Sequence, residues 1–138
     1  MFRSVLVPVD LTEKNEHAVR LARELAGESR GEVTLLHVIE TLDLPFDELE
    51  EFYRRLEEKA ARGMETLAEP LRAAEIPHHR EVAYGKRGEA IVEYAERHAN
   101  DLIIMSSHRV DLADPGSGWT TLSYKVAILA QCPVLLVK

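Results

Sequence analysis

The chain has 138 residues, 46% of them hydrophobic and 30% charged, a composition that excludes fibrous, disordered and disulfide-rich proteins. Its 17 basic and 24 acidic side chains give a formal charge of −7, which disfavours nucleic acid and anionic lipid as partners. Cys132 is the single cysteine, so no internal disulfide can form and the sequence suits a reducing cytoplasm.

We expect no membrane-spanning or export segment at the start of the chain. The apolar run from Phe2 to Val9 is far shorter than the ~20 residues that a bilayer-spanning helix needs, and no cleavage site accompanies it. No linker, low-complexity tract or internal repeat divides the chain. We therefore expect one domain, residues 1–138, located in the cytoplasm and not in a membrane.

The first predicted elements are a strand and a helix. Val5–Val9 is a continuous apolar run of strand length. Apolar residues spaced three or four apart then predict a helix: Ala18, Leu21, Ala22, Leu25 and Ala26. Thr12 is the predicted N-cap of this helix, and Gly27 predicts its end within a residue or two.

A second strand and a long helix follow. Val33–Ile39 is the second apolar run, and we expect His37 inside it to be a hydrogen-bonded residue of the sheet. One apolar stripe then runs from Phe46 to Leu71, which is about seven turns at ~3.6 residues per turn. Pro70 should kink or end this helix, because proline lacks a backbone donor.

Three more strands and two helices complete the prediction. Glu81–Tyr84 is a weak strand, and Gly85–Gly88 opens a helix after it. Leu102–Met105 is the fourth strand, a helix runs from about Thr120 to Gln131, and Val134–Val137 is the last strand. Continuous apolar strands alternating with helices are typical of a parallel sheet covered on both faces. We predict an α/β fold: one doubly wound, five-stranded parallel sheet.

Polar residues fall at the carboxyl ends of these strands, where open parallel sheets bind ligands. Asp10 follows the first strand, and its carboxylate suits a ribose or an adenine amino group. The alternative is that Asp10 helps to cap the helix that starts near Thr12.

The loops around the fourth predicted strand form a candidate anion cradle. Its residues are polar, basic or glycine: Ser106, His108, Arg109, Gly116, Gly118, Thr120 and Thr121. Glycines permit turns that expose N–H groups, and the threonines add hydroxyls at a helix start. The alternative is an ordinary turn at Asp114–Gly116, with Thr120 as an ordinary N-cap.

Known phosphate loops and catalytic clusters are missing from the sequence. It contains neither a Walker-type loop nor a dinucleotide-binding glycine fingerprint. His78 and His79 are adjacent and point to opposite faces if extended, so they do not easily share a metal. Cys132 has no basic cluster beside it in the sequence, which favours an inert thiol. We expect no enzyme, and weak nucleotide hydrolysis is the least favoured alternative.

Five segments, in this order and at these separations, resemble the universal stress protein family: Val5–Asp10, Leu35–Val38, Gly85 with Ala90–Val92, Asp101–Met105 and Cys132–Val137. The resemblance covers nearly the whole chain. It implies the sheet order 3-2-1-4-5, a cytoplasmic location and a role in stress survival or regulation. It also implies a homodimer through the last strand, Val134–Val137, which in that order is an apolar sheet edge that invites pairing.

One branch of this family binds ATP through the pattern Gly-x2-Gly-x9-Gly-Ser/Thr after the fourth strand, and this chain departs from that pattern. Ser106 and Arg109 occupy the first two glycine positions, and Thr120-Thr121 occupies the last pair. A Cβ where a positive φ or a close approach to phosphate is needed costs about 1 kcal/mol or more per site. The resemblance therefore implies an altered phosphate site.

Four further residues complete the candidate nucleotide site. Asp10 and Val38 match the positions that face the ribose and the adenine in ATP-binding relatives, and Pro8 and Met105 stand beside them at strand ends. The candidate ligands are ATP or AMP, with magnesium only through the nucleotide. Two functions stay open: a nucleotide-responsive regulatory dimer with an unknown protein partner, and a dimeric interaction module that binds no nucleotide.

Overall fold

The computed structural model describes residues 1–41, 46–108, 112–113 and 121–138. Within them, strands and helices follow in this order: β1 (Ser4–Pro8), α1 (Asn15–Ser29), β2 (Glu32–Ile39), α2 (Phe46–Leu67), α3 (Glu69–Ala73), β3 (His78–Tyr84), α4 (Arg87–Arg97), β4 (Leu102–Ser106), α5 (Leu122–Leu129) and β5 (Val134–Val137). The five strands form one parallel sheet of order β3-β2-β1-β4-β5. The predicted fold class and strand order are confirmed.

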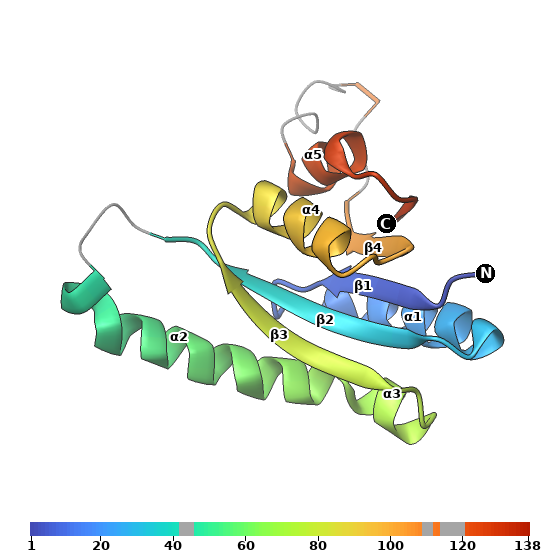
Figure 1. Cartoon of the computed structure of the whole chain (residues 1–138), viewed down its shortest axis with the longest axis horizontal. Helices are drawn as coiled ribbons and strands as arrows, with labels where there is room; N and C mark the ends of the chain where they lie inside the picture. The colour runs from blue at the N-terminus through green and yellow to red at the C-terminus, as the bar shows by residue number, and fades with distance from the viewer. Residues whose placement is uncertain (42–45, 109–111, 114–120) are drawn as a thin grey trace.

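Helices cover both faces of the sheet, with α1, α2 and α3 on one side and α4 and α5 on the other (Figure 1). Alternate residues of β1 serve the two cores, as the period of two in a strand requires. Val5 and Val7 pack with Ala18 and Ala22 of α1, whereas Leu6 packs with Ile91 of α4. Because β1 is buried from both sides, its sequence is a continuous apolar run.

The strand β3 is longer than the sequence predicts. It begins at His78 and not at Glu81, because its first residues pair with Val33, Thr34 and Leu35 of β2. It is an edge strand and four of its seven residues are exposed, so its polar residues pair without being buried. The apolar pattern that marks the central strands is therefore absent from this segment.

The ends of α1 correct one expectation and refine another. Thr12 is not the N-cap, because α1 begins at Asn15 and Lys14 holds the N-cap position without a side-chain bond. The helix ends at Ser29, two residues beyond Gly27 and within the expected margin. Arg30, with φ of +53°, takes the left-handed position and donates its N–H to helix carbonyls.

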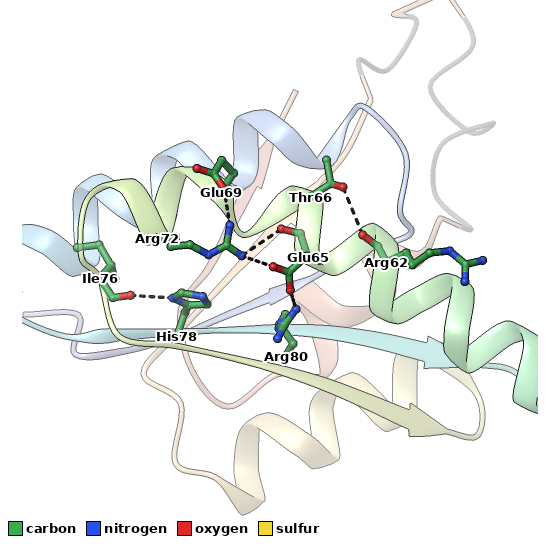
Figure 2. A network of polar contacts seen from close by, with 8 residues as sticks. All are labelled: Arg62, Glu65, Thr66, Glu69, Arg72, Ile76, His78 and Arg80. Carbon is green, nitrogen blue, oxygen red and sulfur yellow. Dashed lines mark hydrogen bonds and ion pairs between the residues drawn. The ribbon is translucent and has the colours of Figure 1, made fainter.

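The helical stripe between β2 and β3 is broken where the sequence predicts. The helix α2 ends at Leu67, and Pro70 lies in the first turn of α3, where its missing N–H costs no helix bond. Figure 2 shows the ion pairs that connect the end of α2 to α3 and to β3. Glu65 of α2 pairs with Arg72 of α3, at 2.8 Å, and with Arg80 of β3.

No helix in the described ranges is long and apolar enough to cross a membrane.

Candidate functional site

A cavity of about 250 Å³ lies at the carboxyl ends of β1, β2 and β4. This volume is close to the lower end of the ~300–1,000 Å³ that is usual for small-molecule sites. The lining comes from these strand ends, the loops beside them and the starts of α4 and α5: Pro8, Val9, Asp10, Lys14, Asn15, Leu36, His37, Val38, Arg87, Ile91, Met105, Ser106, Ser107, His108, Thr121, Leu122 and Ser123. We call it the edge cavity.

Asn15, the first residue of α1, organises the loop after β1. Its side chain is 1% exposed, and its Oδ1 accepts the N–H groups of Asp10 and Leu11 at 3.0 and 2.9 Å. Leu11 has a φ of +71°, a left-handed conformation that is unfavourable for a branched residue. The two bonds to Asn15 hold this turn in place, so the loop is positioned without a glycine.

Asn15 also ties this loop to β4. Its Nδ2 donates to Oγ of Ser106 at 3.2 Å, and that hydroxyl donates to the carbonyl of Lys14 at 3.2 Å. Strand ends that lie far apart in the sequence are thereby fixed against one another. The position of the polar groups around the edge cavity is set before any ligand arrives.

The Asp10 carboxylate closes a local turn and does not cap α1. Its Oδ1 accepts from the N–H and the hydroxyl of Thr12 at 2.9 and 2.6 Å, and α1 begins three residues later. Partial burial raises the pKa of Asp10, but the Thr12 hydrogen bonds and the nearby Lys14 outweigh it, so the pKa lies below the ordinary value. An ionised acceptor therefore lines the edge cavity beside Lys14.

The lining of the cavity also combines a fixed histidine with an apolar surface. Nδ1 of His37 lies 2.9 Å from the carbonyl of Val9 and must donate to it, because a carbonyl only accepts. His37 is thus the hydrogen-bonded sheet residue that the sequence predicts. Val38, Ile91 and Met105 pack together in the core that α4 and α5 cover, and they present a nonpolar surface to the same cavity.

Hydroxyl groups from the residue after β4 and from the start of α5 lie close together in the lining of the cavity. Ser107 lies 3.1 Å from the buried Ser123, and Thr121 lies 3.3 Å from Ser123, measured between hydroxyl oxygens. Thr121 is the N-cap of α5 and accepts the N–H of Tyr124 at 3.4 Å. The start of α5 therefore faces the cavity with hydroxyls that can turn towards a ligand.

Two cations that sequence reasoning missed also line the edge cavity. Lys14 precedes α1 on one side of the sheet, and Arg87 opens α4 on the other. Nε of Arg87 lies 3.8 Å from a carboxylate oxygen of Glu40, and both side chains are more than half exposed. No motif marks Arg87, because it reaches the site through the topology that starts α4 at this edge.

The structure brings together most of the residues that the sequence proposed. Seven of them line the edge cavity: Pro8, Asp10, Val38, Met105, Ser106, His108 and Thr121. Four others lie outside the described residues: Arg109, Gly116, Gly118 and Thr120. Asn15 was missed, although an asparagine at a helix start after a strand is a recognisable signal, because such side chains often bond nearby backbone.

Metal and thiol chemistry receive no support from the described residues. Among them, no group of three or more His, Cys, Asp or Glu side chains could hold a metal ion. Burial raises the pKa of Cys132, whose position near Asp101 acts in the same direction. A thiol that keeps its proton is a poor nucleophile, in line with the inert residue that the sequence predicts.

Comparisons with known proteins agree with this architecture. A sequence model described as the universal stress protein family matches residues 1–138. Universal stress protein YxiE of Bacillus subtilis is 28% identical over 152 residues, covering 100% of both chains. The structure of MJ0577, a universal stress protein of Methanocaldococcus jannaschii, gives a TM-score of 0.81 at 28% identity, covering 100% of this chain and 96% of that one. A universal stress protein from Archaeoglobus fulgidus, solved in complex with dAMP, gives a TM-score of 0.70 at 18% identity, covering 99% and 98%.

Proposed function

The chain belongs to the universal stress protein family, and we propose that it is a regulatory protein that binds an adenine nucleotide, AMP or ATP, in the edge cavity. The observation that carries this proposal is the composition of that cavity. An apolar surface for a base, an ionised acceptor for a ribose and two cations for phosphate line one hollow at the end of a parallel sheet.

The nonpolar end of the cavity suits the base. Val38 and Met105 line the cavity with apolar side chains, which a purine ring can contact. Both hydrogen bonds from Thr12 go to Oδ1 of Asp10, so Oδ2 is the oxygen that can accept from ribose hydroxyls. These two features support a nucleoside position between the ends of β1, β2 and β4.

The phosphate end falls between the hydroxyls and the cations. Ser107, Thr121 and Ser123 supply donors, and Lys14 and Arg87 supply positive charge from opposite faces of the sheet. The dAMP complex of the Archaeoglobus fulgidus relative supports an adenine nucleotide as the ligand class. Arg109, Gly116, Gly118 and Thr120 remain candidates for the same end of the ligand, as does His108.

Calorimetric titration of AMP and ATP, each with and without magnesium, tests the proposal. We expect binding in the micromolar to millimolar range, with magnesium affecting only ATP. Asp10→Asn should weaken both ligands about tenfold, since a hydrogen bond to a charged group contributes about 1.5–3 kcal/mol. Glu93→Gln makes the same chemical change on the exposed side of α4 and should have no effect. If calorimetry detects no binding of AMP or ATP at concentrations up to the millimolar range, the proposal is refuted.

A homodimer through β5 is the quaternary arrangement we propose with this function. β5 is an edge strand, with Leu135 38% exposed, and α5 beside it exposes Ile128 at 62% and Leu129 at 42%. An apolar edge of this kind favours pairing with a second copy. Light scattering should give about twice the 15.6 kDa of one chain, and Leu135→Lys should return the monomer mass.

An interaction module without nucleotide is the second candidate, and the same apolar surface of α5 and β5 favours it. In that case the protein would act in the cytoplasm through its dimer and an unidentified regulatory partner. Mass spectrometry of small molecules that copurify with the native protein separates the two candidates. A turnover assay with ATP, repeated with Asp10→Ala, tests the remaining possibility of weak hydrolysis.

A further inference from the structure

The turn after β1 touches the long helix α2 through one pair of residues. Leu11 of the turn packs against Gly63 of α2. A Cβ built on that glycine would lie 3.0 Å from Cδ2, 3.4 Å from Cβ and 3.5 Å from Cγ of Leu11. The Leu11 side chain therefore fills the space that a side chain at position 63 would need.

The part of α2 that carries Gly63 is firmly packed. Ala60 and Met64, on either side of the glycine, are buried in the same hydrophobic core as Val9. Leu11 is partly buried and packs against that core. Because protein interiors are close-packed and transmit strain, α2 is a rigid surface against which Leu11 rests.

Leu11 is also the central residue of the turn that orients the Asp10 carboxylate. Oδ1 of Asp10 accepts the N–H of Thr12 at 2.9 Å, so the hydrogen bond spans Leu11. The backbone of Leu11 has little freedom to adjust, since its φ is +71° and its N–H is bonded to Oδ1 of Asn15 at 2.9 Å. Side-chain rotation moves Cδ2 of Leu11 but not its Cβ, which is fixed to the backbone of this turn.

We propose that Gly63 is a positioning residue for the edge cavity: by leaving room for Leu11, it sets the direction in which the Asp10 carboxylate enters that cavity. Asp10 lines the edge cavity, whereas Leu11 and Gly63 are not among its lining residues. Gly63 would therefore act only through Leu11. Its effect on nucleotide affinity rests on the proposed function, but its effect on Asp10 itself does not.

The test adds a Cβ at this contact with Gly63→Ala and uses Gly27→Ala of α1 as the matched control. Both glycines lie within helices, so both changes bring a gain in helix propensity. The nearest atom to a Cβ at Gly27 would be Cδ1 of Ile76 at 3.5 Å, an ordinary van der Waals contact. Carbon-13 NMR titration of the Asp10 carboxyl group and calorimetric titration of AMP are the two measurements.

We expect Gly63→Ala to shift Leu11 by a few tenths of an ångström and so to strain the turn between Asp10 and Thr12. Against the effect of burial, the Thr12 hydrogen bonds lower the pKa of Asp10, so weaker bonds should let this pKa rise towards its ordinary value. A misdirected carboxylate should also weaken AMP binding, by about threefold. Gly27→Ala should change neither measurement.

Leu11→Ala provides a rescue. It removes Cγ and both Cδ atoms of the side chain, so the Cβ added at position 63 finds room. Leu11→Ala and Leu11→Ala/Gly63→Ala should therefore give the same Asp10 pKa and the same AMP affinity, a non-additive result that reports direct contact. A plain loss of stability would not produce this pattern, because the carboxyl titration is followed in the folded protein.

An Asp10 pKa that is equal in the unchanged protein and in Gly63→Ala would overturn the positioning role. An equal shift from Gly27→Ala, or a shift that persists in full when Leu11 is truncated, would overturn it too. If the Asp10 pKa rises only in Gly63→Ala while AMP binds no form of the protein, the positioning role is supported and the proposed nucleotide site fails. If AMP binds all forms alike and the pKa does not move, the nucleotide site stands and the positioning role fails.

Discussion

Asn15 and Ser106 are 91 residues apart in the sequence, and their side chains meet in a hydrogen bond of 3.2 Å between Nδ2 and Oγ. The bond joins the start of α1 to the end of β4, and Oδ1 of the same amide holds the turn after β1. One buried side chain therefore fixes two of the strand ends that form the edge cavity.

Asn15→Ala should be among the most destabilising changes at this edge. It leaves two backbone N–H groups without an acceptor and breaks the link to β4, for a loss of about 2–4 kcal/mol. Ser106→Ala removes only the link and should cost about 1 kcal/mol. Urea unfolding measures both values, and an equal cost for the two variants would contradict the role given to the Asn15 carbonyl.

Arg30→Gly should stabilise the protein. Arg30 has a φ of +53° just after α1, a conformation that costs a side-chain-bearing residue about 1 kcal/mol relative to glycine. Its N–H bonds to helix carbonyls are kept in the variant. Glu24→Gly, in the interior of the same helix and exposed, should instead cost about 1 kcal/mol. Thermal unfolding that moves in the same direction for both changes would refute this account.

Tyr84 should titrate well above an ordinary tyrosine. Burial and the hydrogen bond to Glu57 raise the pKa of its hydroxyl to about 12. Between pH 10 and 12 the unfolded chain loses this proton while the native chain keeps it, so the contribution of Tyr84 to stability falls over that range. Ultraviolet titration of the unchanged protein against Tyr84→Phe isolates this group. Glu57→Gln should bring the pKa back towards 10.

Asp10 should remain ionised below the usual range for an aspartate, because Thr12 and Lys14 lower its pKa against the effect of burial. The contribution to stability is present above about pH 3.9 and is lost as the pH falls through the lower native pKa. Carbon-13 NMR of the carboxyl group measures that pKa. Thr12→Val removes the hydroxyl donor and should raise it.

A control for this titration lies on α2. The Thr66 hydroxyl donates to the backbone carbonyl of Arg62 (Figure 2), and neither residue lines the edge cavity. Thr66→Val should therefore leave the Asp10 titration unchanged. If Thr12→Val also leaves it unchanged, the hydroxyl bond at 2.6 Å is not what lowers the pKa.

The spacing of apolar residues predicted the fold well, because a strand that is buried on both sides has to consist of apolar residues. The run from Val5 to Val9 is apolar because helices cover both sides of β1. At the edge strand β3 burial is partial, and His78, His79 and Arg80 pair with β2 without any apolar signal. Strand pairing at an edge depends on the backbone, which periodicity does not record.

The candidate site was predictable only in part, for a different reason. Asp10 and Ser106 could be placed because a residue that follows a parallel strand lies at a known edge. Arg87 could not be placed in this way, since it belongs to a helix start and reaches the cavity from the opposite face. The bond between Asn15 and Ser106 depends on side-chain distances in three dimensions, which the sequence does not provide.

The edge cavity takes its walls from both layers of the molecule, with Lys14 and Asn15 from the α1 side and Arg87 and Ser123 from the side of α4 and α5. A molecule held there would contact residues from both layers, on either side of the sheet. Occupancy would slow amide exchange in helices on opposite sides of the protein together, and so carry a local binding event to both outer surfaces.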